Sequence, residues 1–283
     1  MNKGASVICR IFLLLLPLAC TSVRADDFGL WGAVETSNDI GKTPLSLDLG
    51  IGMRANNNVG SLNRWNINLG LAWTATSWLK LSAGYNMIRS YTNSTRSDKY
   101  DTDTDGTQTW RGYNVDHAYW RNKDRFYVDL RGKLTVGRLS FALRERYQAT
   151  ILSGVWVYED KYRYNTELSE TGETTYVLRE GYPESELELK DHKTKHCIRS
   201  RISVEYDIRN CPLTPEVAFE VSNDLSDGFS CDKRRYSIGV DWKIKKRVHL
   251  QTAYIYTNGD DNDDDSNLHA IELTLSLKNI FSK

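Results

Sequence analysis

Two acidic stretches of this 283-residue sequence place carboxylates at the spacing of a calcium-binding loop. Their aspartates are Asp101, Asp103 and Asp105 in the first stretch and Asp261, Asp263 and Asp265 in the second. The first stretch has Gly106 at the turn position, but Gly112 stands where such a loop needs a bidentate glutamate, and no flanking helix is predicted. We therefore expect solvated acidic loops, or at most a weak external calcium site of the millimolar class, and no other cofactor.

Histidines beside carboxylates are the residues from which a hydrolase could be built. Asp116 precedes His117 and Asp191 precedes His192, but neighbouring residues of an extended chain point in opposite directions. The nucleophile motif G-x-S-x-G does not occur in the sequence. We therefore predict that the chain is not an enzyme.

Most of the remaining charge lies at every second position of extended runs. The closing stretch 268–281 shows this most clearly, because an aliphatic set alternates there with a polar set. The aliphatic set is Ile271, Leu273, Leu275 and Leu277, and the polar set is Glu272, Thr274, Ser276 and Lys278. A period of two is typical of a β-strand whose faces meet different surroundings. Alternation that runs into a near-terminal Phe281 is typical of the last strand of an outer-membrane barrel.

Ten further runs of the same kind precede the closing stretch. They cover residues 28–36, 45–54, 64–73, 79–87, 125–131, 139–148, 198–208, 216–221, 235–244 and 250–256. The connections alternate between short turns and long polar stretches, and the long ones are 55–63, 90–124, 152–196, 223–234 and 258–267. Outer-membrane barrels have short periplasmic turns and long external loops, so the long stretches are predicted to face outward. Local strand signals within 152–196 predict a hairpin that extends beyond the membrane.

The fold class that these runs predict is all-β, an antiparallel transmembrane β-barrel. The mean hydropathy of −0.53 is compatible with it, because only every second residue of a barrel strand needs to be apolar. Sixteen tyrosines and eight tryptophans fit the aromatic girdles of such barrels. Eleven runs conflict with the even strand number of single-chain bacterial barrels, so we predict about ten to twelve strands.

The N-terminal residues 1–25 have the pattern of a signal peptide, with a basic start, a short apolar run and small residues before the cleavage point. The alternative is a lipoprotein signal acylated at Cys20, although Pro17 stands where an aliphatic residue is favoured. The barrel domain would then be residues 26–283. Cleavage of the signal would remove three basic residues. The mature chain would then have 34 basic and 37 acidic residues, a net charge of −3.

The inward faces of the predicted strands are dense in charge of both signs. The candidate lumen residues are Arg64, Lys80, Arg125, Asp129, Arg131, Arg144, Arg146, Arg199, Arg201, Glu205, Glu220, Arg235, Asp241 and Glu272. In a narrow barrel these charges must pair, because an unpaired buried charge costs several kcal/mol. Two interpretations follow. The charges form a salt-bridged lumen that rigidifies a closed barrel, or they line a polar channel whose arginines favour anionic solutes.

Three cysteines follow the signal, namely Cys197, Cys211 and Cys231, and an odd number in an oxidising compartment leaves at least one thiol. The predicted topology puts Cys197 and Cys231 at the external ends of their strands and Cys211 in a periplasmic turn. A membrane thickness separates the two ends of a strand. A disulfide is therefore geometrically allowed only between Cys197 and Cys231.

Several segments of the sequence are also similar to the sequence motifs of one family. These segments are D-F-G-L-W at 27–31, N-R-W-N-I-N-L-G-L at 63–71, W-L-K-L-S-A-G-Y at 78–85, L-R-E-R-Y-Q at 143–148 and R-S-R-I-S-V-E-Y at 199–206. With the closing strand, they make the chain resemble the family called domain of unknown function 2490, barrels of the outer membrane of diderm bacteria. The resemblance covers nearly the whole mature chain. It implies a fold and a location and no activity.

Together these observations predict a monomeric barrel of the cell outer membrane. Its expected partners are outer-membrane lipid and the barrel assembly machinery, and it is not expected to bind nucleic acid. The preferred function is a structural or surface-interaction role with a salt-bridged lumen. The alternative is a narrow pore for small anionic solutes, and an outer-membrane hydrolase is the third interpretation.

Overall fold

The computed structural model describes residues 27–56, 58–102, 104–168, 174–226, 228–259 and 267–280. The predicted signal peptide with Cys20, the aspartates Asp103, Asp261, Asp263 and Asp265, and Phe281 lie outside the described residues. Within the described ranges, no helix is long and apolar enough to cross a membrane.

The chain divides into two compact units. The barrel unit comprises Met1–Ser90, Lys123–Ile151 and Thr194–Lys283, and the sheet unit comprises Tyr91–Asn122 and Leu152–Lys193. Both units draw on segments that are distant in the sequence.

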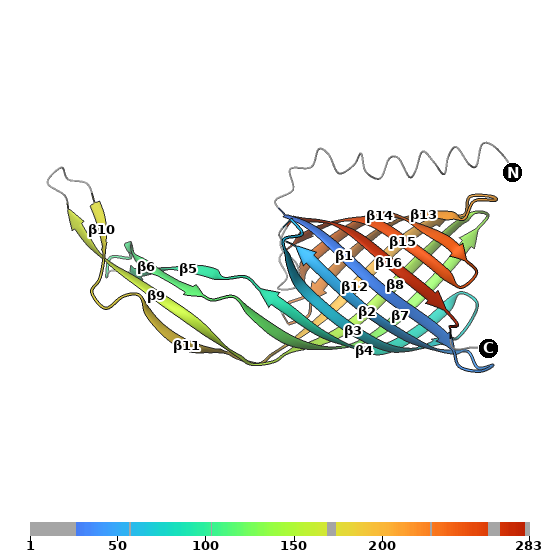
Figure 1. Ribbon diagram of the computed structural model, residues 1–283, viewed down its shortest axis with the longest axis horizontal. Helices are drawn as coiled ribbons and strands as arrows, with labels where there is room; N and C mark the ends of the chain where they lie inside the picture. Colours follow the sequence, from blue (N-terminus) through green and yellow to red (C-terminus); the bar gives the residue numbers. More distant parts are fainter. Residues whose placement is uncertain are drawn as a thin grey trace. The chain divides into compact units, whose positions relative to one another are not determined.

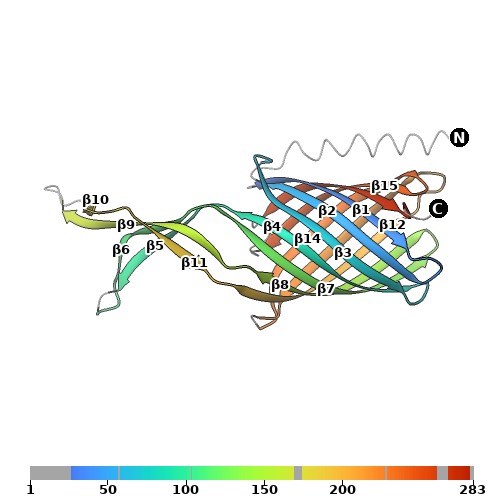
Figure 2. The ribbon, with the colours of Figure 1, turned by 60° about the horizontal axis from the view of Figure 1, so that its bottom comes forward.

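Eleven strands form the closed wall of the barrel unit (Figure 1). They are β1 (Asp27–Asp39), β2 (Leu45–Asn56), β3 (Ser61–Thr74), β4 (Leu79–Thr92), β7 (Tyr119–Val136), β8 (Leu139–Leu152), β12 (Lys193–Tyr206), β13 (Leu213–Asp224), β14 (Ser230–Lys245), β15 (Val248–Gly259) and β16 (Leu268–Lys278). Around the wall the order is β1-β16-β15-β14-β13-β12-β8-β7-β4-β3-β2. The strands are tilted in both views of the barrel (Figure 1 and Figure 2), as closing a sheet requires. The predicted fold class and the range of ten to twelve strands are confirmed.

A parallel pair closes the barrel and explains its odd strand number. In an up-and-down chain of eleven strands the first and last strands run in the same direction, so they can pair only in parallel. β1 and β16 pair in this way over eleven residues, from Asp27 opposite Leu268 to Ser37 opposite Lys278. All eleven runs counted in the sequence therefore belong to the wall.

The two faces of the wall differ as the alternation predicts. The outward face exposes large apolar side chains, among them Ile51, Leu69, Val128, Leu143, Ile202, Val217 and Ile238, and Ile51 is 55% exposed. The inward face buries polar side chains such as Arg125 and Glu220, together with a small apolar cluster of Trp31, Ile255, Leu268 and Ala270. The wall thus has an apolar outer surface and encloses a charged interior.

Two glycines make room for an inward-facing tyrosine of β7, the strand next to β4 in the wall. A Cβ added at Gly70 of β3 would lie 2.8 Å from the hydroxyl oxygen of Tyr127, and a Cβ at Gly84 of β4 would meet the same hydroxyl. Tyr127 is buried, and the guanidinium of Arg146 lies 4.2 Å from the centre of its ring. The ring therefore fills the lumen beside β3 and β4 and gives Arg146 a fixed support.

Five strands form the sheet unit. They are β5 (Thr95–Thr102), β6 (Gln108–Asp116), β9 (Val155–Leu168), β10 (Thr174–Leu178) and β11 (Glu184–Lys190), in the order β10-β9-β6-β5 with β11 also paired to β9. The reading of 90–124 as one long loop is wrong. β5 and β6 form a hairpin there, and β6 pairs with β9, so the two longest connections build one sheet. The aspartates of this stretch favour a loop. On either side of them, however, Tyr100, Trp110 and Tyr113 are aromatic residues, which favour β-strands.

Candidate functional site in the charged barrel lumen

Glu220 is the centre of the densest charge cluster in the lumen. It lies on β13, and Arg144 of β8, Arg199 of β12 and Arg235 of β14 all contact its carboxylate. The nearest nitrogen of Arg144 is 2.6 Å from one oxygen, and that of Arg235 is 3.5 Å from the other. Glu220 is only 5% exposed. One buried carboxylate is therefore shared by three guanidinium groups.

Arg146 and Asp129 form the best-defined single pair. Both nitrogens of the guanidinium fork donate to the two carboxylate oxygens, at 2.5 and 2.6 Å. Such bidentate bonds are stronger and more directional than a single charged hydrogen bond. The pair joins β8 to the neighbouring strand β7.

Further pairs follow the wall toward the end of the barrel where β7 turns into β8. Arg201 contacts Glu216 at 3.0 Å, and Lys133 contacts Glu205 at 2.7 Å. Weaker contacts, each at 3.9 Å, join Arg131 to Glu205 and Lys80 to Asp48, and His249 lies 3.1 Å from Asp241. These pairs link strands that are neighbours or next neighbours around the wall. They line the lumen.

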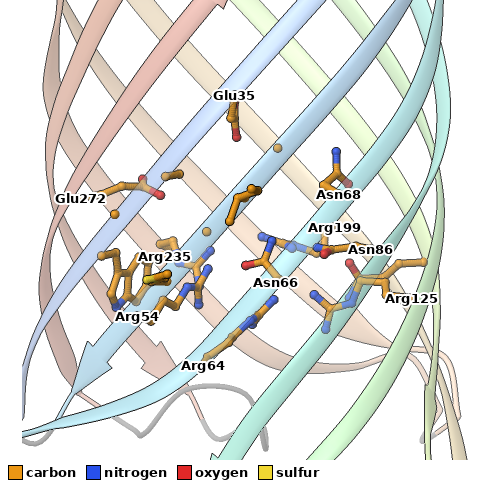
Figure 3. Close-up of a pocket in the computed structure, with 18 of the residues that line it drawn as sticks. Glu35, Arg54, Arg64, Asn66, Asn68, Asn86, Arg125, Arg199, Arg235 and Glu272 are labelled. Atoms are coloured by element: carbon orange, nitrogen blue, oxygen red, sulfur yellow. The ribbon is translucent and has the colours of Figure 1, made fainter.

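A basic cavity of about 180 Å³ lies in the lumen (Figure 3). Seven basic and two acidic side chains line it: Arg54, Arg64, Arg125, Arg146, Arg199, Lys233, Arg235, Glu35 and Glu272. Figure 3 shows the labelled arginines gathered in one part of the cavity and Glu35 lying apart from them. The amides of Asn66, Asn68, Asn86 and Gln148 complete the polar wall. The lining is therefore strongly positive.

Trp31 holds two of these arginines in place. The residue is 2% exposed, and its indole nitrogen donates to the Oδ1 atom of Asn56 at 3.3 Å. The guanidinium carbon of Arg54 lies 3.9 Å from the ring centre, and that of Arg235 lies 5.3 Å from it. Cation–π contacts of this kind orient a guanidinium plane without neutralising its charge.

A larger cavity of about 500 Å³ is also lined by lumen residues. Its charges are nearly balanced, with seven basic residues (Arg54, Arg131, Arg144, Arg146, Arg199, Arg201 and Arg235) and six acidic ones (Glu35, Glu205, Glu216, Glu220, Asp241 and Glu272). Seven lining residues are common to both cavities: Trp31, Glu35, Arg54, Arg146, Arg199, Arg235 and Glu272. The two cavities therefore adjoin.

The structure places all fourteen candidate lumen residues on the inward face, and twelve of them line one or both cavities. The other two, Lys80 and Asp129, contact Asp48 and Arg146. Sequence reasoning missed Trp31, Glu35 and Lys233. Glycines interrupt the alternation near the first two, and Lys233 lies in a stretch read as a loop, although β14 already begins at Ser230. The parity of Lys233 with Arg235 could have found it.

The candidate calcium residues that the structure describes already have partners. Asp101 is the second-last residue of β5 and forms an ion pair with Arg111, while a carboxylate oxygen of Asp105 accepts a hydrogen bond from the backbone N–H of Thr107 at 2.9 Å. Gly106, with a φ of +86°, makes the turn between β5 and β6. The motif thus forms a hairpin turn, and its middle ligand, Asp103, lies outside the described residues.

Three other carboxylates gather in the sheet unit, but a lysine occupies the place of a cation. The ligand atoms of Asp116, Glu159 and Glu188 lie within 4.8 Å of one another. The ammonium of Lys190 is 3.0 Å from Asp116 and 2.5 Å from Glu188. Its ammonium group thus contacts two of the three carboxylates.

His117 forms no catalytic triad with the carboxylate and hydroxyl beside it. His117 lies 2.7 Å from Asp160, and the hydroxyl of Ser185 donates to the same carboxylate at 2.5 Å. These contacts hold the pKa of Asp160 below its usual value, the serine contributing most. In a catalytic triad the imidazole stands between the hydroxyl and the carboxylate, whereas here the carboxylate is central, so the serine lacks a base.

The predicted disulfide between Cys197 and Cys231 is wrong. Both side chains are thiols in the structure. Cys197 lies on β12 and Cys231 on β14, and β13 runs between these strands. Two strand spacings amount to about 9.5 Å, which exceeds the distance that a disulfide spans. The sulfur of Cys197 instead contacts the hydroxyl of Ser222 at 2.9 Å.

Fold and lumen together define a closed, predominantly antiparallel β-barrel protein with a charged interior. The family model described as protein of unknown function (DUF2490) matches residues 28–267, and the chain belongs to this family. The predicted family is confirmed.

No curated protein is similar enough in sequence to be matched to the chain. Among solved structures, the chain is similar to one titled "NanC porin structure in rhombohedral crystal form", with 11% identity and a TM-score of 0.36 over 85% of this chain and 93% of that chain. It is also similar to the translocator domain of the autotransporter NalP from Neisseria meningitidis, with 10% identity and a TM-score of 0.29 over 90% of each chain.

Proposed function

We propose that the chain is an outer-membrane β-barrel whose lumen forms a narrow passage for small anions. The apolar outward face supports the membrane location, because a soluble protein rarely exposes so continuous an apolar surface and lipid would cover it. In this proposal the barrel is a monomer, inserted by the barrel assembly machinery, and the long connections face the cell exterior.

The single observation that carries the proposal is the excess of positive charge around the basic cavity. Seven basic and two acidic side chains line it. In a confined polar space, a lining of one sign raises the local concentration of the opposite ion. The nearly balanced larger cavity adjoins it and supplies polar volume without opposing its charge.

The course of the ion pairs favours a passage over a solid plug. The pairs of Arg146 with Asp129 and of Arg201 with Glu216 each join neighbouring strands of the wall. Pairs between neighbouring strands lie along the wall, and Arg146, Arg201 and Glu216 also line the cavities. The same pairs are compatible with a structural role of the barrel, so a measurement of ion flux is needed to distinguish an anion passage from that role.

A chloride-flux assay tests the proposal. The refolded protein is reconstituted into vesicles that contain a chloride-quenched dye, and a parallel set contains a potassium-sensitive dye. We expect chloride entry to exceed potassium entry, and the double variant Arg54→Gln/Arg235→Gln to slow chloride entry. The matched control is Arg138→Gln/Arg209→Gln, because both arginines are exposed in short turns. Heat-modifiable barrels that admit neither ion would contradict the passage and leave the structural role.

A second candidate function, surface interaction, is favoured by one face of the sheet unit. Ring contacts connect Trp110, Tyr113, Tyr162, Tyr164 and Tyr176 across three strands, and the ring centres of Tyr113 and Tyr162 are 4.6 Å apart. On β9 the same parity continues to Tyr158 and Trp156. Trp156 is 63% exposed. An exposed aromatic face of this kind marks an interaction surface.

Fluorescence titration tests this second candidate. Extracellular polysaccharide is added to the full chain and to the variant Trp156→Ala/Tyr158→Ala, with Glu186→Gln on the opposite face as the control. A saturable change that the aromatic variant loses and the control keeps supports an interaction surface. No saturable change in the full chain counts against it for this class of partner.

A further inference from the structure

We infer that the basic cavity is a binding site for small hydroxylated oxyanions, molecules that carry a carboxylate or phosphate beside hydroxyl groups. The inference rests on the proposed anion passage and names the solute class that the passage would favour. Its ground is the chemistry of the cavity wall.

The positive groups of the cavity select oxyanions over halides. Six of its seven basic residues are arginines. A guanidinium is a planar fork whose paired N–H donors match two oxygens of one carboxylate or phosphate, which a spherical halide cannot use. Arginine also keeps its charge at every physiological pH.

Two of these arginines are fixed before any ligand binds. Arg54 and Arg235 both lie against the ring of Trp31, which is buried and anchored by its bond to Asn56. A donor that is already held in place loses less conformational entropy on binding. Trp31 therefore serves as a positioning residue for the two arginines.

The acids near the cavity do not cancel its charge. Glu220 divides its carboxylate among Arg144, Arg199 and Arg235, and Asp129 is held by Arg146. Glu35 lies apart from the labelled arginines in Figure 3. A net positive lining remains, and it is complementary to an anion.

Buried amides supply the recognition of hydroxyl groups. Gln148 is 7% exposed and Asn86 is half-buried, and the amide oxygen of each is buried and accepts no hydrogen bond from a protein donor. Both residues line the cavity. A buried acceptor gains most from a ligand that brings its own donor, which a hydroxyl group does. The arginines and the amides together thus fit an oxyanion with hydroxyl groups.

Calorimetry of the refolded full chain in detergent tests the site. The probes are sodium gluconate, sodium acetate and sodium phosphate, each titrated against a chloride background. We expect gluconate to bind most tightly. Arg54→Gln/Arg235→Gln should weaken every probe about tenfold, in line with the loss of a charged hydrogen bond. Gln148→Leu should weaken gluconate and leave acetate and phosphate unchanged.

The controls separate this site from the passage. Arg138→Gln/Arg209→Gln should bind all three probes as the unchanged chain does, and heat-modifiable mobility shows that each variant is folded. Binding without chloride flux would keep the site and overturn the passage, whereas flux without binding would do the reverse. If the unchanged chain and Arg54→Gln/Arg235→Gln bound each of the three probes with the same affinity, the site would be overturned. Tighter binding of phosphate than of gluconate would overturn the role of the amides.

Discussion

The barrel lumen and the sheet unit use charge in opposite ways. In the lumen, three arginines converge on the one carboxylate of Glu220, which is buried. In the sheet unit, acids and bases meet largely one to one at more exposed sites, as Lys161 does with Glu186 and Arg111 with Asp101. The lumen keeps a positive excess, whereas the described residues of the sheet unit hold nine basic and twelve acidic side chains.

The energetic consequences of the two arrangements differ as well. Breaking a buried ion pair by removing one partner is expensive, because the remaining charge stays out of water. An exposed pair contributes little, since water solvates either partner when the other is lost. Equivalent neutralising substitutions should therefore have large effects in the lumen and small ones in the sheet unit.

The largest effect is expected for Glu220→Gln. The substitution leaves three arginines around a neutral amide, and we expect the free energy of unfolding to fall by about 3–5 kcal/mol. Urea unfolding of the barrel in lipid vesicles measures it. The matched control is Glu216→Gln, whose less buried pair with Arg201 should cost less than about 1 kcal/mol. Equal losses for the two variants would contradict the special place of Glu220.

Asp129→Asn should have the next largest effect. It removes the bidentate acceptor of Arg146, so we expect a loss of about 2–3 kcal/mol in the free energy of unfolding. Asp48→Asn is the control, because Lys80 lies 3.9 Å from that carboxylate and the contact is weak. If Asp48→Asn destabilised the barrel as much as Asp129→Asn, bidentate geometry would not be the cause.

In the sheet unit, a low pH should reduce the local stability of the strands around Asp160. Its folded pKa lies below the usual value, so its contribution to stability is complete above the unfolded pKa of about 3.9 and is lost as the pH falls through the folded pKa. Hydrogen-exchange protection of β9 and β11, corrected for the intrinsic pH dependence of exchange, should therefore fall below about pH 4. Ser185→Ala should reduce this pH dependence, because it removes the largest cause of the shift. Unaltered pH dependence in Ser185→Ala would contradict the role of the hydroxyl.

The smallest effect is expected for Glu186→Gln. Its partner Lys161 is on the charged face of the sheet unit, and Glu186 is exposed. We expect a change within about 0.5 kcal/mol in the local stability of β11, measured by the same hydrogen exchange. A loss comparable with that of Asp129→Asn would remove the distinction between the two units.

The sequence predicted which face each residue occupies, because alternation is a local property. Leu143 and Arg144 are neighbours, and the first is exposed on the outer wall while the second contacts Glu220 inside. The partners within the lumen could not be predicted in the same way. The arginines around Glu220 come from β8, β12 and β14, and their meeting depends on the stagger of the closed barrel.

The predicted barrel is confirmed, but the sequence did not predict the parallel pair that closes it, and the reason is related to the error in the cysteine pairing. The pairing of β1 with β16 joins strands from the two ends of the sequence. In β1, glycines interrupt the alternation of apolar and polar residues, so the pattern of this strand is weak. The sequence predicted Cys197 and Cys231 at the same end of the barrel. The prediction of a disulfide did not consider that β13 lies between their two strands. Lateral position around the wall is set by nonlocal pairing, which a run of alternating residues does not encode.

The most direct test of the anion passage is the reversal potential of single barrels in a planar bilayer under a potassium chloride gradient. The account predicts stepwise conductance with a reversal potential on the chloride side of zero. Arg54→Gln/Arg235→Gln should move that potential toward zero, and Arg138→Gln/Arg209→Gln should leave it in place. A reversal potential at zero or on the potassium side in the unchanged chain would contradict the account.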